Sequence, residues 1–237
     1  MTLIDKPEHM KLQLHKDIFA KYPQLKVAFI LATPIAVNNK FSESRHLLRE
    51  AETLVHLTFN RNNFQSHDLI SPWMVARQEF GQKAPHYHTS VEHLLKRVLA
   101  RKRIAGNTTV TNLVSYLSLK HIVPMTVDDP DKIIGTLTFA LAVGPEKKNL
   151  FRRLEKGALY YHDEKKVLGM KLDYWKNPRV ALSSTSISAL IHIEVLPPVT
   201  SSQLQAMVKE TQQLIKTFCG GKSKVVVLDR KKRTASL

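Results

Sequence analysis

The hydrophobic period of the chain changes near its midpoint, and this change restricts the fold more than any other feature. Before Gly135, apolar residues recur at helical spacing, as in 47–55 and 94–99. After Gly135 they alternate with a period of two, as in 137–143 and 187–195. Helices therefore dominate the first half and strands the second, without regular alternation. This order predicts an α+β fold, with helices packed on mostly antiparallel sheets, and disfavours a doubly wound sheet.

Local signals fix several helix ends. Thr89–Glu92 and Thr200–Gln203 have the spacing of a capping box. Ser42 is expected to cap an earlier helix, and Gly220 to end the last one. The segment 220–223, Gly-Gly-Lys-Ser, therefore follows a helix where a phosphate-binding loop would follow a strand, and that function is excluded.

The patterned segments continue without a compositional break, and residues 1–229 are predicted to form one domain. The last eight residues, 230–237, are rich in Lys and Arg and are predicted to form a flexible basic tail. The segment 61–71 is polar and is predicted to be a loop.

The charge balance favours a polyanionic partner. Lys and Arg number 36 against 20 Asp and Glu, which gives a net charge of +16 and a pI near 9.9. Lys and Arg that neutralise phosphates release condensed counterions, so such an excess favours nucleic acid. The alternatives are a basic protein without a polyanionic partner and a weak membrane-surface binder.

Cysteine content and hydropathy indicate a reducing, aqueous compartment. Cys219 is the single cysteine, so neither an intrachain disulfide nor a multi-cysteine zinc site can form. The longest apolar run, 27–32, is too short to span a bilayer, and 1–15 contains no apolar signal core. A cytoplasmic protein that does not bind membranes is predicted.

No motif indicates a metal or cofactor. His86, His88 and His93 are close in sequence, but no cysteine or second cluster completes a tetrahedral shell. The Gly-x-Ser-x-Gly elbow of serine hydrolases is absent from the sequence. We therefore expect neither metal nor cofactor.

Glu194 stands out in an otherwise apolar strand. It shares a strand face with Leu190 and His192, so its carboxylate lies either at a solvent-facing surface or in a cleft. The polar positions of 112–126 precede the acidic run 128–131, which a simple interpretation treats as a turn with solvated carboxylates.

The ordered series of segments resembles the editing module, domains B-three and B-four, of the phenylalanyl-tRNA synthetase beta subunit, and free-standing proteins built on it. The resemblance extends from about Phe19 to Lys216 and depends on the order of the segments, not on one motif. The segments that carry it are Pro23–Leu25, Thr89–Leu99, Asn107–Pro124, Asp129–Gly135, Gly157–Tyr161 with Asp163, and Ile187–Glu194.

The resemblance implies a three-layer architecture and hydrolysis of the ester that joins a wrong amino acid to tRNA. The family's pocket glutamate, which recognises the amino-acid side chain, corresponds to Glu194, and its pocket histidine corresponds to Thr126. Ser115 and Thr126 are expected to act in catalysis. Asn112 and Ser118, together with Glu194, are expected to bind the substrate.

The expected partner is the aminoacyl end of tRNA, and two groups of cations are predicted to contact it. They are Lys96, Arg97, Arg101, Lys102 and Arg103, and Lys147, Lys148, Arg152 and Arg153. The leading hypothesis is a trans-acting aminoacyl-tRNA deacylase that serves translation fidelity. A catalytically inactive tRNA- or RNA-binding module and a hydrolase of small esters are the alternatives.

Overall fold

The computed structural model describes residues 10–60, 63–147, 153–172 and 175–237. The helices are α1 (Ile18–Lys21), α2 (Phe41–Thr58), α3 (Ser71–Arg77), α4 (Ser90–Leu99), α5 (Thr109–His121) and α6 (Ser201–Cys219). The strands are β1 (Lys11–Leu14), β2 (Lys26–Thr33), β3 (Met125–Asp128), β4 (Leu137–Leu141), β5 (Leu159–His162), β6 (Val167–Met170), β7 (Ala189–Val195), β8 (Lys222–Leu228) and β9 (Thr234–Ser236). The predicted α+β class is confirmed.

One sheet is antiparallel throughout and has the strand order β3-β7-β2-β8. In its register Ile191 of β7 lies between Ile30 of β2 and Val127 of β3. Every residue of β7 is buried. Both faces of this strand are therefore buried, so its alternating pattern does not mark one face as buried and the other as solvated.

The second sheet has the order β6-β5-β4-β1-β9. Its β1 and β4 are parallel, and its other pairs are antiparallel. The predicted flexible tail is wrong for the last residues, because β9 pairs with β1 and Leu237 is buried. Backbone hydrogen bonds in both directions between Met10 and Leu237 close this edge of the sheet.

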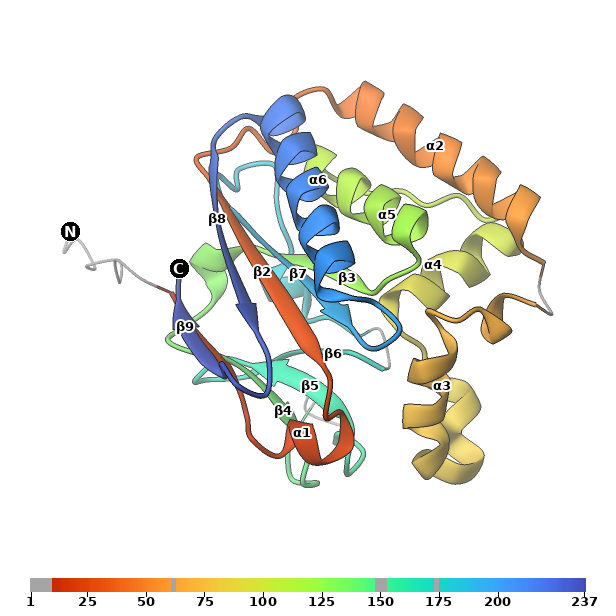
Figure 1. Ribbon diagram of the computed structural model, residues 1–237. Coiled ribbons are helices and arrows are strands. Elements are labelled where there is room, and N and C mark those ends of the chain that lie inside the picture. The colour runs from red at the N-terminus through yellow and green to blue at the C-terminus, as the bar shows by residue number, and fades with distance from the viewer. Residues whose placement is uncertain (1–9, 61–62, 148–152, 173–174) are drawn as a thin grey trace.

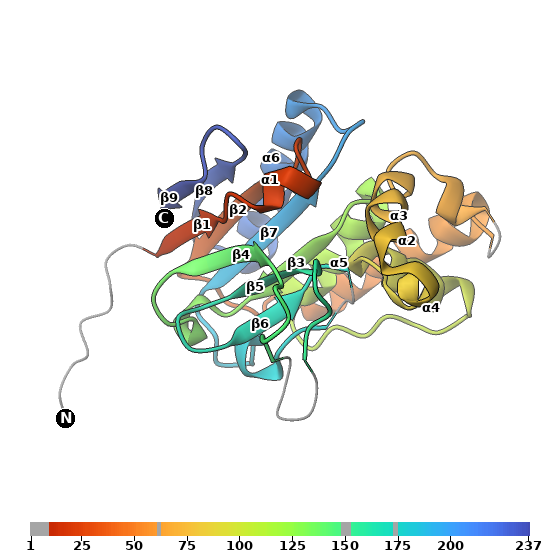
Figure 2. The same cartoon turned by 90° about the horizontal axis from the view of Figure 1, so that it is seen from below.

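The elements form three layers (Figure 1). Helices α5 and α6 cover one face of the four-stranded sheet, and the five-stranded sheet covers the other. Ile191 and Ile193 of β7 pack in the core under the helices, whereas Leu190 packs in the core between the sheets. Helices α2, α3 and α4 lie together at one side of the sheets (Figure 2).

The predicted capping boxes of α4 and α6 are confirmed, and Gly220 follows the last residue of α6 with a φ of 75°. The predicted cap at Ser42 is wrong, because α2 begins at Phe41 and Lys40 is the N-cap residue. The predicted loop 61–71 contains a 3₁₀ turn at Phe64–Ser66 and leads directly into α3. No helix in the described part of the chain is long and apolar enough to cross a bilayer.

Candidate functional site

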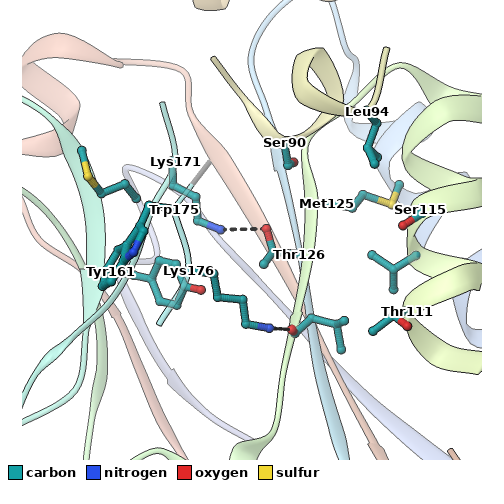
Figure 3. A pocket seen from close by; sticks show the side chains of 13 residues that line it. Ser90, Leu94, Thr111, Ser115, Met125, Thr126, Tyr161, Lys171, Trp175 and Lys176 are labelled. Atoms are coloured by element: carbon teal, nitrogen blue, oxygen red, sulfur yellow. Dashed lines mark hydrogen bonds between the residues drawn. The ribbon is translucent and has the colours of Figure 1, made fainter. Parts of the chain in front are cut away.

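A cavity of about 210 Å³ lies where α4, α5 and β3 meet the segment after β6 (Figure 3). Its apolar walls are Leu94, Val114, Met125, Val127, Met170 and Trp175. Its polar lining residues are Ser90, Thr111, Ser115, Thr126, Tyr161, Lys171 and Lys176. No carboxylate is among the lining residues that the structure describes.

Ser115 and Thr126, the two predicted catalytic residues, both line this cavity. Ser115 extends from the middle of α5 and Thr126 from β3, which follows α5 in the chain. Both residues are half-buried. Within the described chain, the Ser115 hydroxyl has no hydrogen-bond partner, whereas the Thr126 oxygen accepts a hydrogen bond from Lys171 (3.3 Å). Hydroxyl groups from two adjacent elements therefore border one small space.

The two other predicted substrate-binding residues on α5 lie away from the cavity. Asn112 is fully buried; its amide donates to the Ser44 hydroxyl of α2 (2.9 Å) and its side-chain oxygen accepts from the Gly106 N–H (3.2 Å). Ser118 is also fully buried, and its hydroxyl donates to the Val123 carbonyl at the end of α5 (2.7 Å). Both side chains satisfy backbone groups or a neighbouring helix, and neither lines the cavity.

Lys171 connects the cavity to a group of buried ionisable residues. Its ammonium group lies 2.6 Å from Glu194 Oε1, 2.8 Å from His192 Nδ1 and 3.3 Å from Thr126 Oγ1. Glu194 and Thr126 supply oxygen acceptors for this ammonium group, and the role of His192 Nδ1 depends on its tautomer. Burial lowers the pKa of Lys171, and the carboxylates of Glu194 and Asp128 oppose this shift. The Lys171 side chain is therefore fixed in orientation as well as buried.

Asp128 is the second buried carboxylate of this group. Its Oδ2 lies 2.9 Å from His192 Nε2, and its Oδ1 lies 2.9 Å from Lys176 Nζ and accepts from the Tyr161 hydroxyl (3.4 Å). Burial alone would raise the pKa of Asp128, but Lys176 and His192 outweigh burial and hold it well below its usual value. Asp128 is thus ionised despite its complete burial.

We refer to Asp128, Lys171, Lys176, His192 and Glu194 as the buried ionic network. The sequence-based interpretation missed the first four of them. Asp128 was assigned to a solvated turn, yet β3 places it opposite Leu190 of β7, between the two sheets. The sequence contained one signal for this network, because His192 and Glu194 occupy the same face of one strand. The structure shows that both faces of this strand are buried.

The expected position of Glu194 needs correction. Its side chain is 1% exposed, so it lies neither at a solvent-facing surface nor in the cavity wall, but behind Lys171. Lys171 and His192 outweigh the effect of burial, which alone would raise the pKa of Glu194, so this pKa is lowered. Its Oε2 atom has no hydrogen-bond partner among the described residues. Glu194 therefore contacts the cavity only through Lys171.

The hydrogen-bond directions define what the network presents to the cavity. His192 contacts Asp128 Oδ2 through Nε2, and its Nδ1 lies 2.8 Å from both Lys171 Nζ and Glu194 Oε1, so the imidazole bridges the two carboxylates of the network. Lys171 in turn donates to Thr126 Oγ1, which leaves the Thr126 hydroxyl hydrogen free to point elsewhere. Hydrogen bonds in such a chain polarise one another. Thr126 is therefore a strengthened hydrogen-bond donor at the cavity wall.

A basic groove of about 350 Å³ lies between α2 and the segment after α4. Its lining includes Arg49 and His56 from α2 and the predicted cations Arg101, Lys102 and Arg103. All five of these residues are exposed. The groove therefore brings together two residues of α2 and three of the cations that the sequence predicted to contact tRNA.

The other predicted cations differ in their surroundings. Lys96 contacts His88 (2.5 Å), and burial lowers the pKa of its ammonium group. Arg97 donates to the Arg103 carbonyl (2.8 Å), which holds the segment after α4. Lys147 and Arg153 are exposed, and their backbones pair as an isolated antiparallel β-bridge. Lys148 and Arg152 lie outside the described residues.

Comparisons with known proteins give distant structural similarity and no sequence match. No family model matches the chain, and no curated protein matches it. A crystal structure of an N-terminal fragment of the phenylalanyl-tRNA synthetase beta subunit from Pyrococcus horikoshii is similar, with a TM-score of 0.39 and 9% sequence identity. The alignment covers 94% of this chain and 52% of that fragment, so the chain spans about half of it. A similarity this distant assigns neither a family nor an activity.

Proposed function

We propose that this protein binds the aminoacyl end of tRNA and hydrolyses the ester of misacylated tRNA. The observation that carries the proposal is the small cavity bordered by the hydroxyl groups of Ser115 and Thr126, with Lys171 fixed behind Thr126. The sequence resemblance to a tRNA-editing module and the net charge of +16 support the choice of tRNA.

The size of the cavity limits what it can hold. Its volume of about 210 Å³ is below the range of roughly 300–1,000 Å³ that is typical of pockets for drug-sized ligands. One acyl group of amino-acid size fits, and a nucleoside in addition does not. The ribose and phosphates of the terminal nucleotide must then lie outside the cavity.

The hydroxyl groups supply the chemistry that ester hydrolysis needs. Water attacks the ester carbonyl carbon, the bond to the ribose oxygen breaks, and that oxygen ends with a proton derived from the water. Thr126 donates a hydrogen bond to the carbonyl oxygen as negative charge develops there, and Ser115 orients the attacking water. Neither ATP nor a metal ion takes part in this scheme.

The basic groove is the proposed contact for the RNA backbone. Helix α4 begins with Ser90 at the cavity and ends shortly before Arg101–Arg103 in the groove. A helix of ten residues spans roughly 15 Å. The acyl group and the more distant phosphates of one acceptor strand can therefore be held at opposite ends of the same helix.

Thr126→Val tests this assignment, because valine keeps the shape of the side chain and removes the hydroxyl. Loss of one donor to a developing oxyanion typically lowers the rate about 10²- to 10³-fold. We expect such a loss in deacylation with unchanged tRNA affinity. Thr217→Val on the exposed surface of α6 is the matched control and should retain full activity.

Two results would refute the catalytic assignment. Equal deacylation by wild type and Thr126→Val would remove Thr126 from the mechanism. Salt-sensitive tRNA binding without hydrolysis by the wild type would leave an inactive tRNA-binding module.

A further inference from the structure

The polar groups that face the cavity are hydrogen-bond donors. Thr126 accepts from Lys171, so its hydroxyl hydrogen is directed away from Lys171. Lys176 uses two acceptors, the Val127 carbonyl and Asp128 Oδ1, and retains a third N–H. Figure 3 shows Lys171 and Lys176 on one side of the cavity and Ser115 on the other.

Ser90 adds an unpaired buried hydroxyl to this wall. It is the first residue of α4, is 6% exposed, and its Oγ has no hydrogen-bond partner among the described residues. A helix N-terminus carries a partial positive charge, which favours negative groups beside it. A buried polar atom without a partner costs free energy unless a ligand or water satisfies it.

The carboxylates of the network lie behind the cations and not in the wall. Glu194 reaches the cavity only through Lys171, and Asp128 is paired with Lys176. None of the described lining residues is acidic, so the wall itself supplies no counter-charge for a basic side chain inside the cavity. The remaining wall is apolar, with Leu94 and Met125 among its members.

We infer that the cavity binds the carboxylate of a small acid with an apolar tail, through Thr126, Lys176 and Ser90, and binds an amine of the same size that lacks a carboxylate more weakly. This inference specifies the chemical class of ligand that the proposed active site binds. It rests on the proposed function only in taking an ester of tRNA as the source of that acid. In hydrolysis the ester carbonyl takes the same position, and the carboxylate of the released amino acid binds there as the product. Acyl groups with neutral side chains are then preferred to those with basic side chains.

A matched pair of probes tests the inference without tRNA. The probes are 3-phenylpropanoate and 3-phenylpropylamine, titrated into the full chain and followed by calorimetry and protein-detected NMR. We expect the acid to bind at least tenfold more tightly than the amine. Thr126→Val should weaken binding of the acid about tenfold, as loss of a hydrogen bond to a charged group does. Lys176→Met should do the same, and the exposed Lys165→Met should have no effect.

Each outcome separates this inference from the proposed function. Equal binding of the two probes, no binding of the acid, or unchanged binding of the acid in Thr126→Val overturns the inference. Because Lys176→Met also removes a partner of buried Asp128, Thr126→Val decides if the lysine variant does not fold. Acid-selective binding by a protein that hydrolyses no aminoacyl-tRNA keeps the inference and refutes the deacylase.

Discussion

Two of the sets of buried charges in the described chain differ in whether they line the cavity. Arg77 of α3 and Glu92 of α4 form a bidentate pair with two contacts of 2.8 Å, and Glu92 also accepts from the backbone and hydroxyl of Thr89. Neither member lines the cavity. The buried ionic network instead reaches the cavity through Lys171 and Lys176.

The difference indicates what each set does. The Arg77–Glu92 pair joins two helices, and Glu92 also completes the capping box of α4, so the hydrogen bonds of this pair stabilise the fold itself. In the network one carboxylate oxygen, Glu194 Oε2, has no hydrogen-bond partner among the described residues. The Thr126 hydroxyl accepts from Lys171, so its own hydrogen is left to donate to a group in the cavity. A buried ion pair is weak evidence for stability by itself. Contact with the cavity is the reason why we propose a functional role for the network.

The largest effect is expected from breaking the Arg77–Glu92 pair. Arg77→Met leaves the Glu92 carboxylate buried without its cation, which typically costs about 3–5 kcal/mol of the free energy of unfolding. The midpoint of thermal unfolding should fall by roughly 10 °C. Urea denaturation measures the change, and the exposed Glu43→Gln on α2 should stay within about 0.5 kcal/mol of wild type. A loss below about 1 kcal/mol would contradict a structural role.

A double-mutant cycle on Lys171 and Glu194 tests the same contrast in the network. Lys171→Met strands the Glu194 carboxylate and should cost about 3 kcal/mol. Adding Glu194→Met removes the stranded charge and should restore much of the stability, because apolar replacement of a buried pair is often neutral. The double variant should fold and yet lose deacylation. Full deacylation activity in the folded double variant would show that Lys171 and Glu194 have no role in deacylation.

Acid should remove the stability that the carboxylates of the network contribute. The cations hold the pKa values of Asp128 and Glu194 below their usual values. The unfolded chain therefore binds protons at a higher pH than the folded protein, so these carboxylates contribute fully above about pH 5. Their contribution is lost as the pH falls through the lowered folded pKa values.

Asp128→Asn should flatten this dependence. Its free energy of unfolding should be lower than that of wild type at pH 7 and should change less between pH 6 and pH 3. Chemical denaturation across that range provides the measurement, with the exposed Asp17→Asn as the control. A variant curve parallel to that of wild type would show that Asp128 does not titrate differently in the two states.

The smallest effect concerns the basic groove, which contributes to affinity and not to stability. Alanine at Arg101, Lys102 and Arg103 should weaken tRNA binding and lower the salt slope by about 2 to 3, because each phosphate contact contributes roughly 0.7–0.9. A triple alanine variant at Lys209, Lys216 and Lys222 removes the same charge from α6 and β8 and is the matched control. Equal slopes in the two triple variants would assign the effect to net charge alone.

The two sets also show which features a sequence can reveal. The box at Thr89 and Glu92 was predictable because its partners are three residues apart and the pattern is local. Arg77 as the partner of Glu92 was not, since no helix was predicted over α3 and tertiary packing brings Arg77 to Glu92. Periodicity predicted β7, but not that its second face would be covered by another sheet.

The candidate site was harder to predict because it is assembled from separate segments. Thr126, Lys171 and His192 belong to β3, the segment after β6, and β7, and no fixed spacing joins them. The resemblance to an editing module directed attention to Ser115 and Thr126, which do border the cavity. It also directed attention to Asn112 and Ser118, whose polar atoms are hydrogen-bonded elsewhere.

The most direct test of the account is deacylation of a panel of misacylated tRNAs by the wild-type protein, without ATP and with metal ions chelated. The half-life of the ester bond is measured for each tRNA with and without the protein. The account predicts a shorter half-life for at least one tRNA with a neutral acyl side chain, and little change for lysyl- and arginyl-tRNA. Half-lives that the protein leaves unchanged across the whole panel would contradict it.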